Sequence, residues 1–194
     1  MLDFQIMDFW NWFEKNSDKL QSDKYAKSLL KKLDETISSW KLCWEIGSGF
    51  IKPNSLAISP NGDKELIERT NKIIAGAPQL DSWEFYSFKQ RKDNWDKAKL
   101  MDSDVKINAE DWTYILLKYQ DNVTEILIKA DNLKGLSTET KEIAVDLVLT
   151  NLLGEELKIK TIDFIDIIDV FDDSKGETKL KYLPAHLDRT QNGA

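Results

Sequence analysis

Few side chains in this sequence have the chemistry that catalysis usually requires. The 194 residues include one histidine, His186, and one cysteine, Cys43. A single imidazole removes most histidine-based metal sites and leaves one catalytic base of the usual kind. No serine lies in the G-x-S-x-G pattern of a nucleophile elbow. The sequence therefore favours a protein without enzymatic activity, and it indicates no cofactor and no metal.

Carboxylates recur at intervals of three near the C-terminus, at Asp163, Asp166 and Asp169. Clustered carboxylates can bind a hard cation. If the segment is a strand, however, Asp166 projects to the face opposite Asp163 and Asp169, so one ion could not gather all three. We interpret these acids as charges that keep the edge of a sheet soluble and unpaired.

Aromatic side chains are abundant, with seven tryptophans and eight phenylalanines. Near the N-terminus the rings occupy nearly consecutive positions of a predicted helix, so some of them should face away from the core. Exposed rings at this density indicate a contact surface for another protein or for a second copy of the chain. The residues that we assign to this predicted surface are Phe9, Trp10, Trp12, Phe13 and Trp95.

Carboxylates beside tryptophans support a second hypothesis, a small-ligand binder or a hydrolase. A carboxylate next to a ring can have its pKa raised enough to act as an acid. The pocket would lie where the loop over residues 89–104 covers the sheet, and its candidate residues are Glu45, Glu84, Asp111 and Trp112. A structural homo-oligomer is the third hypothesis.

Hydrophobic spacing predicts the elements that position these residues. Apolar residues recur at helical spacing in four segments, two of which begin at the capping residues Asp63 and Ser137. Runs rich in β-branched and aromatic residues, bounded by turn residues, predict strands. The predicted helices cover 8–14, 25–39, 63–76 and 137–154, and the predicted strands cover 42–46, 55–59, 83–88, 112–119, 124–130 and one or two within 158–170.

These elements predict an α+β fold. We expect a mixed or antiparallel sheet of about five to seven strands with about four helices packed on it. The length fits one domain, and no repeat or low-complexity linker divides the chain, so a single domain over residues 1–194 is expected.

The acidic composition limits the partners. The formal net charge is −7 and the pI is about 4.9. Long-range forces therefore repel nucleic acid and anionic lipid, and they favour a basic protein partner such as a toxin domain. No stretch approaches the ~20 apolar residues that cross a bilayer, and the first residues lack the pattern of a signal peptide. We expect a cytoplasmic protein with no membrane association.

Several blocks of the sequence resemble an uncharacterised bacterial protein family. They are FWNWFE (9–14), WEIGSG (44–49), SLAISPNGDKEL (55–66), APQLDSWEFYSFK (77–89), DWTYILLKY (111–119) and LLGEEL (152–157). The resemblance covers most of the chain. It implies a bacterial cytoplasmic setting and transfers no activity, cofactor or site residue.

Overall fold

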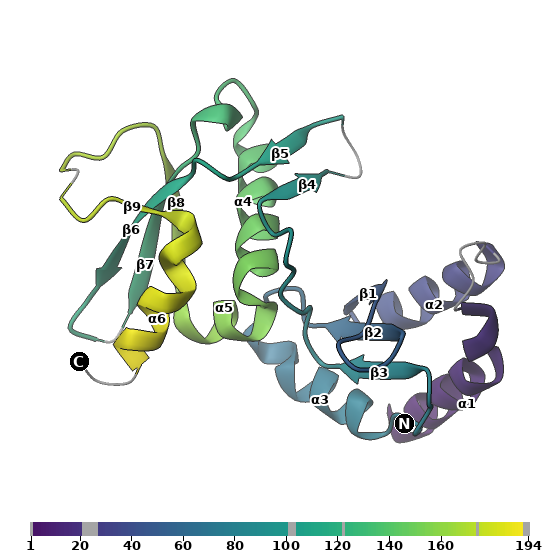
Figure 1. Cartoon of the computed structure of the whole chain (residues 1–194). Coiled ribbons are helices and arrows are strands. Elements are labelled where there is room, and N and C mark those ends of the chain that lie inside the picture. The colour runs from purple at the N-terminus through teal and green to yellow at the C-terminus, as the bar shows by residue number, and fades with distance from the viewer. Residues whose placement is uncertain (1, 21–26, 101–103, 122, 174, 192–194) are drawn as a thin grey trace. The chain divides into compact units, whose positions relative to one another are not determined.

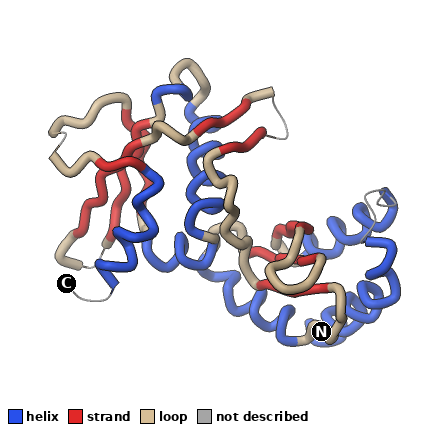
Figure 2. Tube along the Cα trace, in the orientation of Figure 1, coloured by secondary structure: helices blue, strands red, loops and turns tan. Residues whose placement is uncertain are grey.

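The computed structural model describes the chain except for residues 1, 21–26, 101–103, 122, 174 and 192–194. The chain divides into two compact units, Met1–Lys89 and Gln90–Ala194. Both combine helices with strands, as the colours of Figure 2 show, so the α+β class is confirmed.

In its described residues, the first unit has a three-stranded sheet and three α-helices; Figure 1 shows their arrangement. In the sheet, β2 is the central strand, antiparallel to β1 and parallel to β3. The elements of this unit are α1 (Leu2–Leu20), α2 (Lys27–Ser39), β1 (Cys43–Gly47), β2 (Asn54–Ser59), the 3-10 turn η1 (Lys64–Leu66), α3 (Ile67–Ala75) and β3 (Trp83–Tyr86).

Aromatic rings fill much of the core of the first unit. Phe13 of α1 is fully buried and meets Trp83 of β3 edge-on, with ring centroids 4.9 Å apart. Trp10, one turn earlier, donates its indole N–H to the carbonyl oxygen of Ile73 at 2.7 Å. The rings of α1 therefore fix this helix both to the sheet and to α3.

The described part of the second unit has a four-stranded sheet with the order β8-β7-β6-β9 and a separate two-stranded ladder, β4-β5. The β7–β8 pair is parallel, and the other pairs are antiparallel. The elements are β4 (Lys97–Lys99), β5 (Lys106–Asn108), β6 (Thr113–Lys118), β7 (Thr124–Lys129), η2 (Asp131–Leu133), α4 (Thr138–Leu153), α5 (Glu155–Thr161), β8 (Phe164–Ile168), β9 (Thr178–Lys179), η3 (Leu180–Tyr182) and α6 (Leu183–Gln191).

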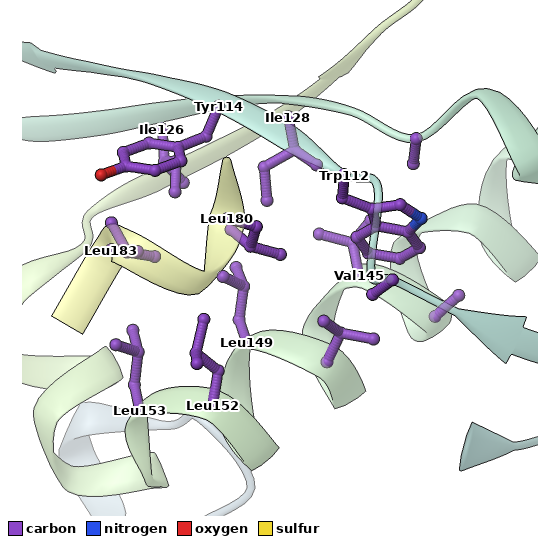
Figure 3. Packing of buried hydrophobic residues seen from close by; sticks show 14 of the residues in the cluster. Trp112, Tyr114, Ile126, Ile128, Val145, Leu149, Leu152, Leu153, Leu180 and Leu183 are labelled. Atoms are coloured by element: carbon purple, nitrogen blue, oxygen red, sulfur yellow. The ribbon is translucent and has the colours of Figure 1, made fainter. Parts of the chain in front are cut away.

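Aliphatic side chains dominate the core of the second unit. Figure 3 shows Ile126 and Ile128 of the sheet facing Leu149 of α4, with Leu180 and Leu183 between them. Trp112 and Tyr114 add two rings. Because side chains alternate along a strand, one face of the sheet packs on this core and the other face points away from it.

Several predicted elements are confirmed. The predicted hairpin corresponds to β6 and β7, and the two short strands near the N-terminus are the neighbours β1 and β2. Ser137 caps α4 by accepting a hydrogen bond from the backbone N–H of Thr140, and Asp63 accepts one from Glu65 before α3. Gly154 follows α4 with a φ of 77°, as a helix-ending glycine does.

The expected single sheet and the expected number of helices were wrong. In the described part of the chain, the strands form sheets of three, two and four strands, and there are six α-helices. The segment read as strand from residue 158 begins with α5, because Gly154 lets the chain turn and start a new helix. The predicted 89–104 loop includes β4.

The expectation of a single domain stays a prediction. The two compact units have separate core clusters. Separate cores can unfold in one cooperative step or one after the other. Within the described residues, no helix is long and apolar enough to span a bilayer.

Candidate functional site

A short loop between β1 and β2 presents two large apolar side chains to solvent. Phe50 is 66% exposed and Ile51 is 93% exposed. The loop is closed at its base, where the backbone N–H of Gly49 donates to the carbonyl oxygen of Pro53 at 3.4 Å. We call residues 48–53 the apolar loop.

The carboxylate of Glu84 on β3 holds the apolar loop in place. One oxygen, Oε2, accepts the backbone N–H of Phe50 at 2.7 Å, and the other, Oε1, accepts those of Ile51 at 2.7 Å and Lys52 at 2.8 Å. Tyr86 donates its hydroxyl to Oε2 at 2.5 Å. Four donors thus converge on one side chain and fix the backbone that carries the exposed residues.

The same contacts determine the protonation of the two residues beneath the loop. The hydrogen bond from Tyr86, followed by those from the loop amides, lowers the pKa of Glu84 to about 2. Burial, together with the neighbouring carboxylate of Glu84, raises the pKa of Tyr86 to about 12. At neutral pH Glu84 is therefore an anion and Tyr86 a neutral donor, which are the forms that this network needs.

Gly49 allows the loop to approach Glu84 closely. A Cβ atom at this position would lie 2.5 Å from the carbonyl oxygen of Lys52 and 2.6 Å from Oε2 of Glu84. Contacts this short force atoms to move, so no other residue fits without displacing the loop. On the outer side, the ring of Phe50 packs against Tyr86 with centroids 6.2 Å apart.

A hollow of about 430 Å³ lies beside the apolar loop, lined in part by Ile51, Lys52, Pro78 and Trp83. Lys52 donates its ammonium group to the carbonyl oxygen of Leu80 at 2.7 Å, which ties the loop to the chain before β3. The indole N–H of Trp83 is buried and has no hydrogen-bond partner among the described residues. The hollow is thus lined by both apolar and polar side chains, the latter including Glu84 and Tyr86.

The predicted N-terminal contact residues lie mainly in the core. Phe9, Trp10 and Phe13 are buried. Trp12 is half-buried and lines a groove of about 330 Å³ between α1 and α2. Trp95 is half-buried against the core of the second unit. A binding role for these five residues stays a prediction.

The residues of the predicted pocket fall in both units. Glu45 and Glu84 lie on the same face of the first sheet, two strands apart, because Glu45 pairs with Ala57 and Ala57 pairs with Tyr86. Asp111 belongs to the second unit, where its exposed side chain pairs with Lys179 at 2.7 Å. Trp112 also belongs to the second unit, where its indole N–H donates to the side-chain oxygen of Asn132 at 2.7 Å.

The protonation of Glu84 and Asp111 does not suit general acid catalysis. Proximity to a tryptophan was expected to raise the pKa, but the pKa of Glu84 is about 2, and the hydrogen bond from Lys179 lowers the pKa of Asp111. A general acid at neutral pH needs a raised pKa. Neither carboxyl group therefore holds a proton to donate.

The single histidine forms a contact across the second unit. The imidazole Nδ1 of His186, on α6, lies 2.9 Å from the hydroxyl oxygen of Tyr114 on β6. Burial raises the pKa of Tyr114 to about 12, so its hydroxyl stays protonated at neutral pH. This pair links α6 to the sheet. The described residues include no group of three or more metal-ligating side chains.

The apolar loop and its supports Gly49 and Tyr86 were not predicted from the sequence. A local signal was present, because Phe50 and Ile51 are consecutive apolar residues between Gly49 and Pro53, where the chain cannot continue a strand. Comparison of the chain with protein-family models, curated proteins and solved structures finds no match. The resemblance to a bacterial family therefore stays a prediction.

Proposed function

We propose that this protein is a non-enzymatic protein-binding module that uses the apolar loop as a contact surface. The observation that supports this most is the fixed exposure of Phe50 and Ile51 above the carboxylate of Glu84. Isolated exposed apolar residues are common on protein surfaces. Here two adjacent apolar residues lie in a loop whose backbone donates three hydrogen bonds to the carboxylate of Glu84, so they form an ordered apolar projection.

An ordered loop is well suited to binding. Association orders the side chains and loops at an interface, and this lowers the affinity. The backbone of the apolar loop is already fixed, so less order remains to be imposed when a partner binds. Aromatic and aliphatic anchors that enter a pocket of the partner supply much of the binding free energy of protein interfaces. Phe50 and Ile51 are such anchors.

The charge of the chain supports a basic partner. The net charge is −7, and complementary charge speeds the encounter of two proteins. The same charge disfavours nucleic acid as the partner. A bacterial cytoplasmic location is part of this proposal, because the blocks resemble a bacterial family and the lone Cys43 forms no intramolecular disulfide.

Photo-crosslinking from the loop tip tests the proposal. A photoreactive phenylalanine at position 51 should form one discrete adduct in a native lysate, and excess unlabelled wild-type protein should remove it. The Phe50→Ser/Ile51→Ser protein should not compete. The same probe at Glu68, which is exposed on α3, is the positional control. No adduct, or an equal adduct from position 68, would overturn the proposal.

A second variant separates loop geometry from loop composition. Gly49→Ala keeps Phe50 and Ile51 but forces the loop away from Glu84, because the added carbon meets the carbonyl oxygen of Lys52. We expect this protein to compete poorly for the adduct while its circular dichroism stays that of the wild type. Full competition would show that the fixed loop is not needed.

The mass of the crosslinked adduct also distinguishes self-association of the chain from binding to a different protein. An adduct with the mass of two chains, together with a dimer in light scattering, would assign the apolar loop to self-association. An adduct with a different protein and a monomer in light scattering would support the heterologous partner that we propose.

A further inference from the structure

The four-stranded sheet of the second unit ends at β8. This strand pairs with β7 through residues 164–168 and is the last strand on its side of the sheet. The chain then crosses to the opposite edge, where β9 pairs with β6. A terminal strand directs one row of backbone N–H and C=O groups away from its sheet, and an extended peptide can pair with that row.

The two faces of β8 differ. Ile165 and Ile167 pack against the core of the unit. Alternation places Phe164, Asp166 and Ile168 on the opposite face, where Phe164 is 60% exposed. Phe164 is thus an exposed apolar side chain beside an acidic one, on the strand that ends the sheet.

The acids along this edge repeat at intervals of three. Asp163, Asp166 and Asp169 are all exposed. Residues that lie opposite each other in neighbouring strands have their side chains on the same face. The carboxylate of Asp163, however, accepts the backbone N–H of Thr124 at 3.0 Å and is held against β7. An added strand with basic residues at the same interval would therefore place one beside Asp166 and one beside Asp169, on opposite faces.

A second copy of β8 is a poor occupant of this edge. Antiparallel pairing of two β8 strands about their centre places Asp166 opposite Asp166 of the other copy, and Asp163 opposite Asp169. Like charges directly opposite each other destabilise a strand pair. The acids that oppose self-pairing favour a basic strand in the same position.

We infer that the edge of β8 binds an extended basic segment of another protein as an added strand. The segment has lysine or arginine opposite Asp166 and Asp169, and it has an apolar β-branched residue opposite Phe164. Main-chain hydrogen bonds to the outer edge of β8 hold the segment, and the two acids select its charge and register. This site lies within the second unit and does not depend on the apolar loop.

A synthetic peptide tests this inference directly. The capped peptide Lys-Val-Thr-Lys-Thr-Val-Lys reads the same in both directions, so it matches the acids whichever way it pairs. We expect saturable binding to the whole chain by NMR titration. We also expect slower hydrogen exchange of those amides of residues 164–168 that point away from β7 when the peptide is bound.

Matched variants separate strand pairing from simple charge attraction. Asp166→Lys should weaken binding roughly tenfold, whereas Glu142→Lys, an equal change of charge at an exposed position of α4, should leave it within about twofold. Two N-methylated peptides that together block every backbone donor keep all the charges. At least one of them should lose binding.

Three results would overturn the inference. Equal binding by both N-methylated peptides, or equal weakening by Glu142→Lys and Asp166→Lys, would show attraction by net charge alone. No saturable binding to the wild type would show that the edge is closed. Slow exchange at residues 164–168 in a dimer of the chain alone would assign the edge to a second copy.

Discussion

The two units of this chain build their cores from different side chains. In the first unit, Phe13 and Trp10 of α1 pack edge-to-face against rings of β3. In the second unit, Leu149 and its neighbours on α4 pack against the isoleucines of β7 (Figure 3). Rings prefer a few relative orientations, whereas aliphatic side chains of similar volume replace each other more easily. The first core should therefore tolerate changes of shape less well.

The largest effect is expected in the aromatic core. Phe13→Ala removes a fully buried ring and should lower the free energy of unfolding by about 3–5 kcal/mol, measured by urea denaturation. Phe4→Ala changes a ring that is 64% exposed on the same helix and should stay within about 0.5 kcal/mol of the wild type. Equal losses in the two proteins would contradict the burial of Phe13.

The Phe13→Ala protein also tests the predicted single domain. If residues 1–194 unfold as one cooperative domain, hydrogen-exchange protection should fall in both units to the same degree. A loss confined to residues 1–89 would contradict the single domain and would show that the two cores are independent in stability.

A smaller effect is expected from changes of shape in the aliphatic core. Leu149→Ala should lower the free energy of unfolding by about 2–5 kcal/mol, and Leu149→Met by less than about 1.5 kcal/mol. Phe13→Leu should destabilise the chain more than Leu149→Met, because a leucine cannot restore the edge-on contact with Trp83. If denaturation shows the reverse order, the contrast between the two cores is wrong.

A buried lysine provides a test of polar contacts in the second unit. Lys158 of α5 is buried, forms an ion pair with Asp146, and donates to the hydroxyl oxygen of Thr150 at 2.9 Å. Lys158→Met keeps an aliphatic chain and leaves Asp146 solvated, so the free energy of unfolding should change by less than about 1 kcal/mol. Lys158→Ala, which also leaves a cavity, should destabilise more.

The smallest change in global stability is expected from the charge beneath the apolar loop. The pKa of Glu84 is lowered from 4.5 to about 2, so its stabilisation is complete above pH 4.5 and is lost as the pH falls toward 2. The amide NMR signals of residues 50–52 should shift within this window. In Glu84→Gln they should stay independent of pH, while Glu68→Gln should behave like the wild type. Shifts in the Glu84→Gln protein would contradict this assignment.

Local signals in the sequence were enough to predict many elements. A helix start depends on a few neighbouring residues, so Asp63 and Ser137 could be assigned as caps. The β6–β7 hairpin was predicted because its two strands and its turn are adjacent in the chain. Short-range information of this kind was sufficient for the α+β class.

Contacts between residues that are far apart in the chain could not be predicted from the sequence. Glu84 binds loop amides 32 to 34 residues earlier, and nothing near position 84 indicates those partners. Lys158 is buried because it contacts Asp146 and Thr150 of the preceding helix. Those partners cannot be inferred from the residues next to Lys158, so the end of α5 was joined to the apolar run that follows it and predicted as strand. The division of the strands among three sheets likewise depends on pairing that local patterns do not specify.

The support of the apolar loop and its tip are made of different residues. Gly49, Glu84 and Tyr86 set the path of the backbone, whereas the side chain of Ile51 is almost fully exposed and that of Phe50 contacts the support at the ring of Tyr86. The side chains of the tip can therefore be exchanged without removing the hydrogen bonds that fix the backbone. A library that varies positions 50 and 51 alone would keep one backbone shape and sample many surfaces, which makes this loop a starting point for engineered binders.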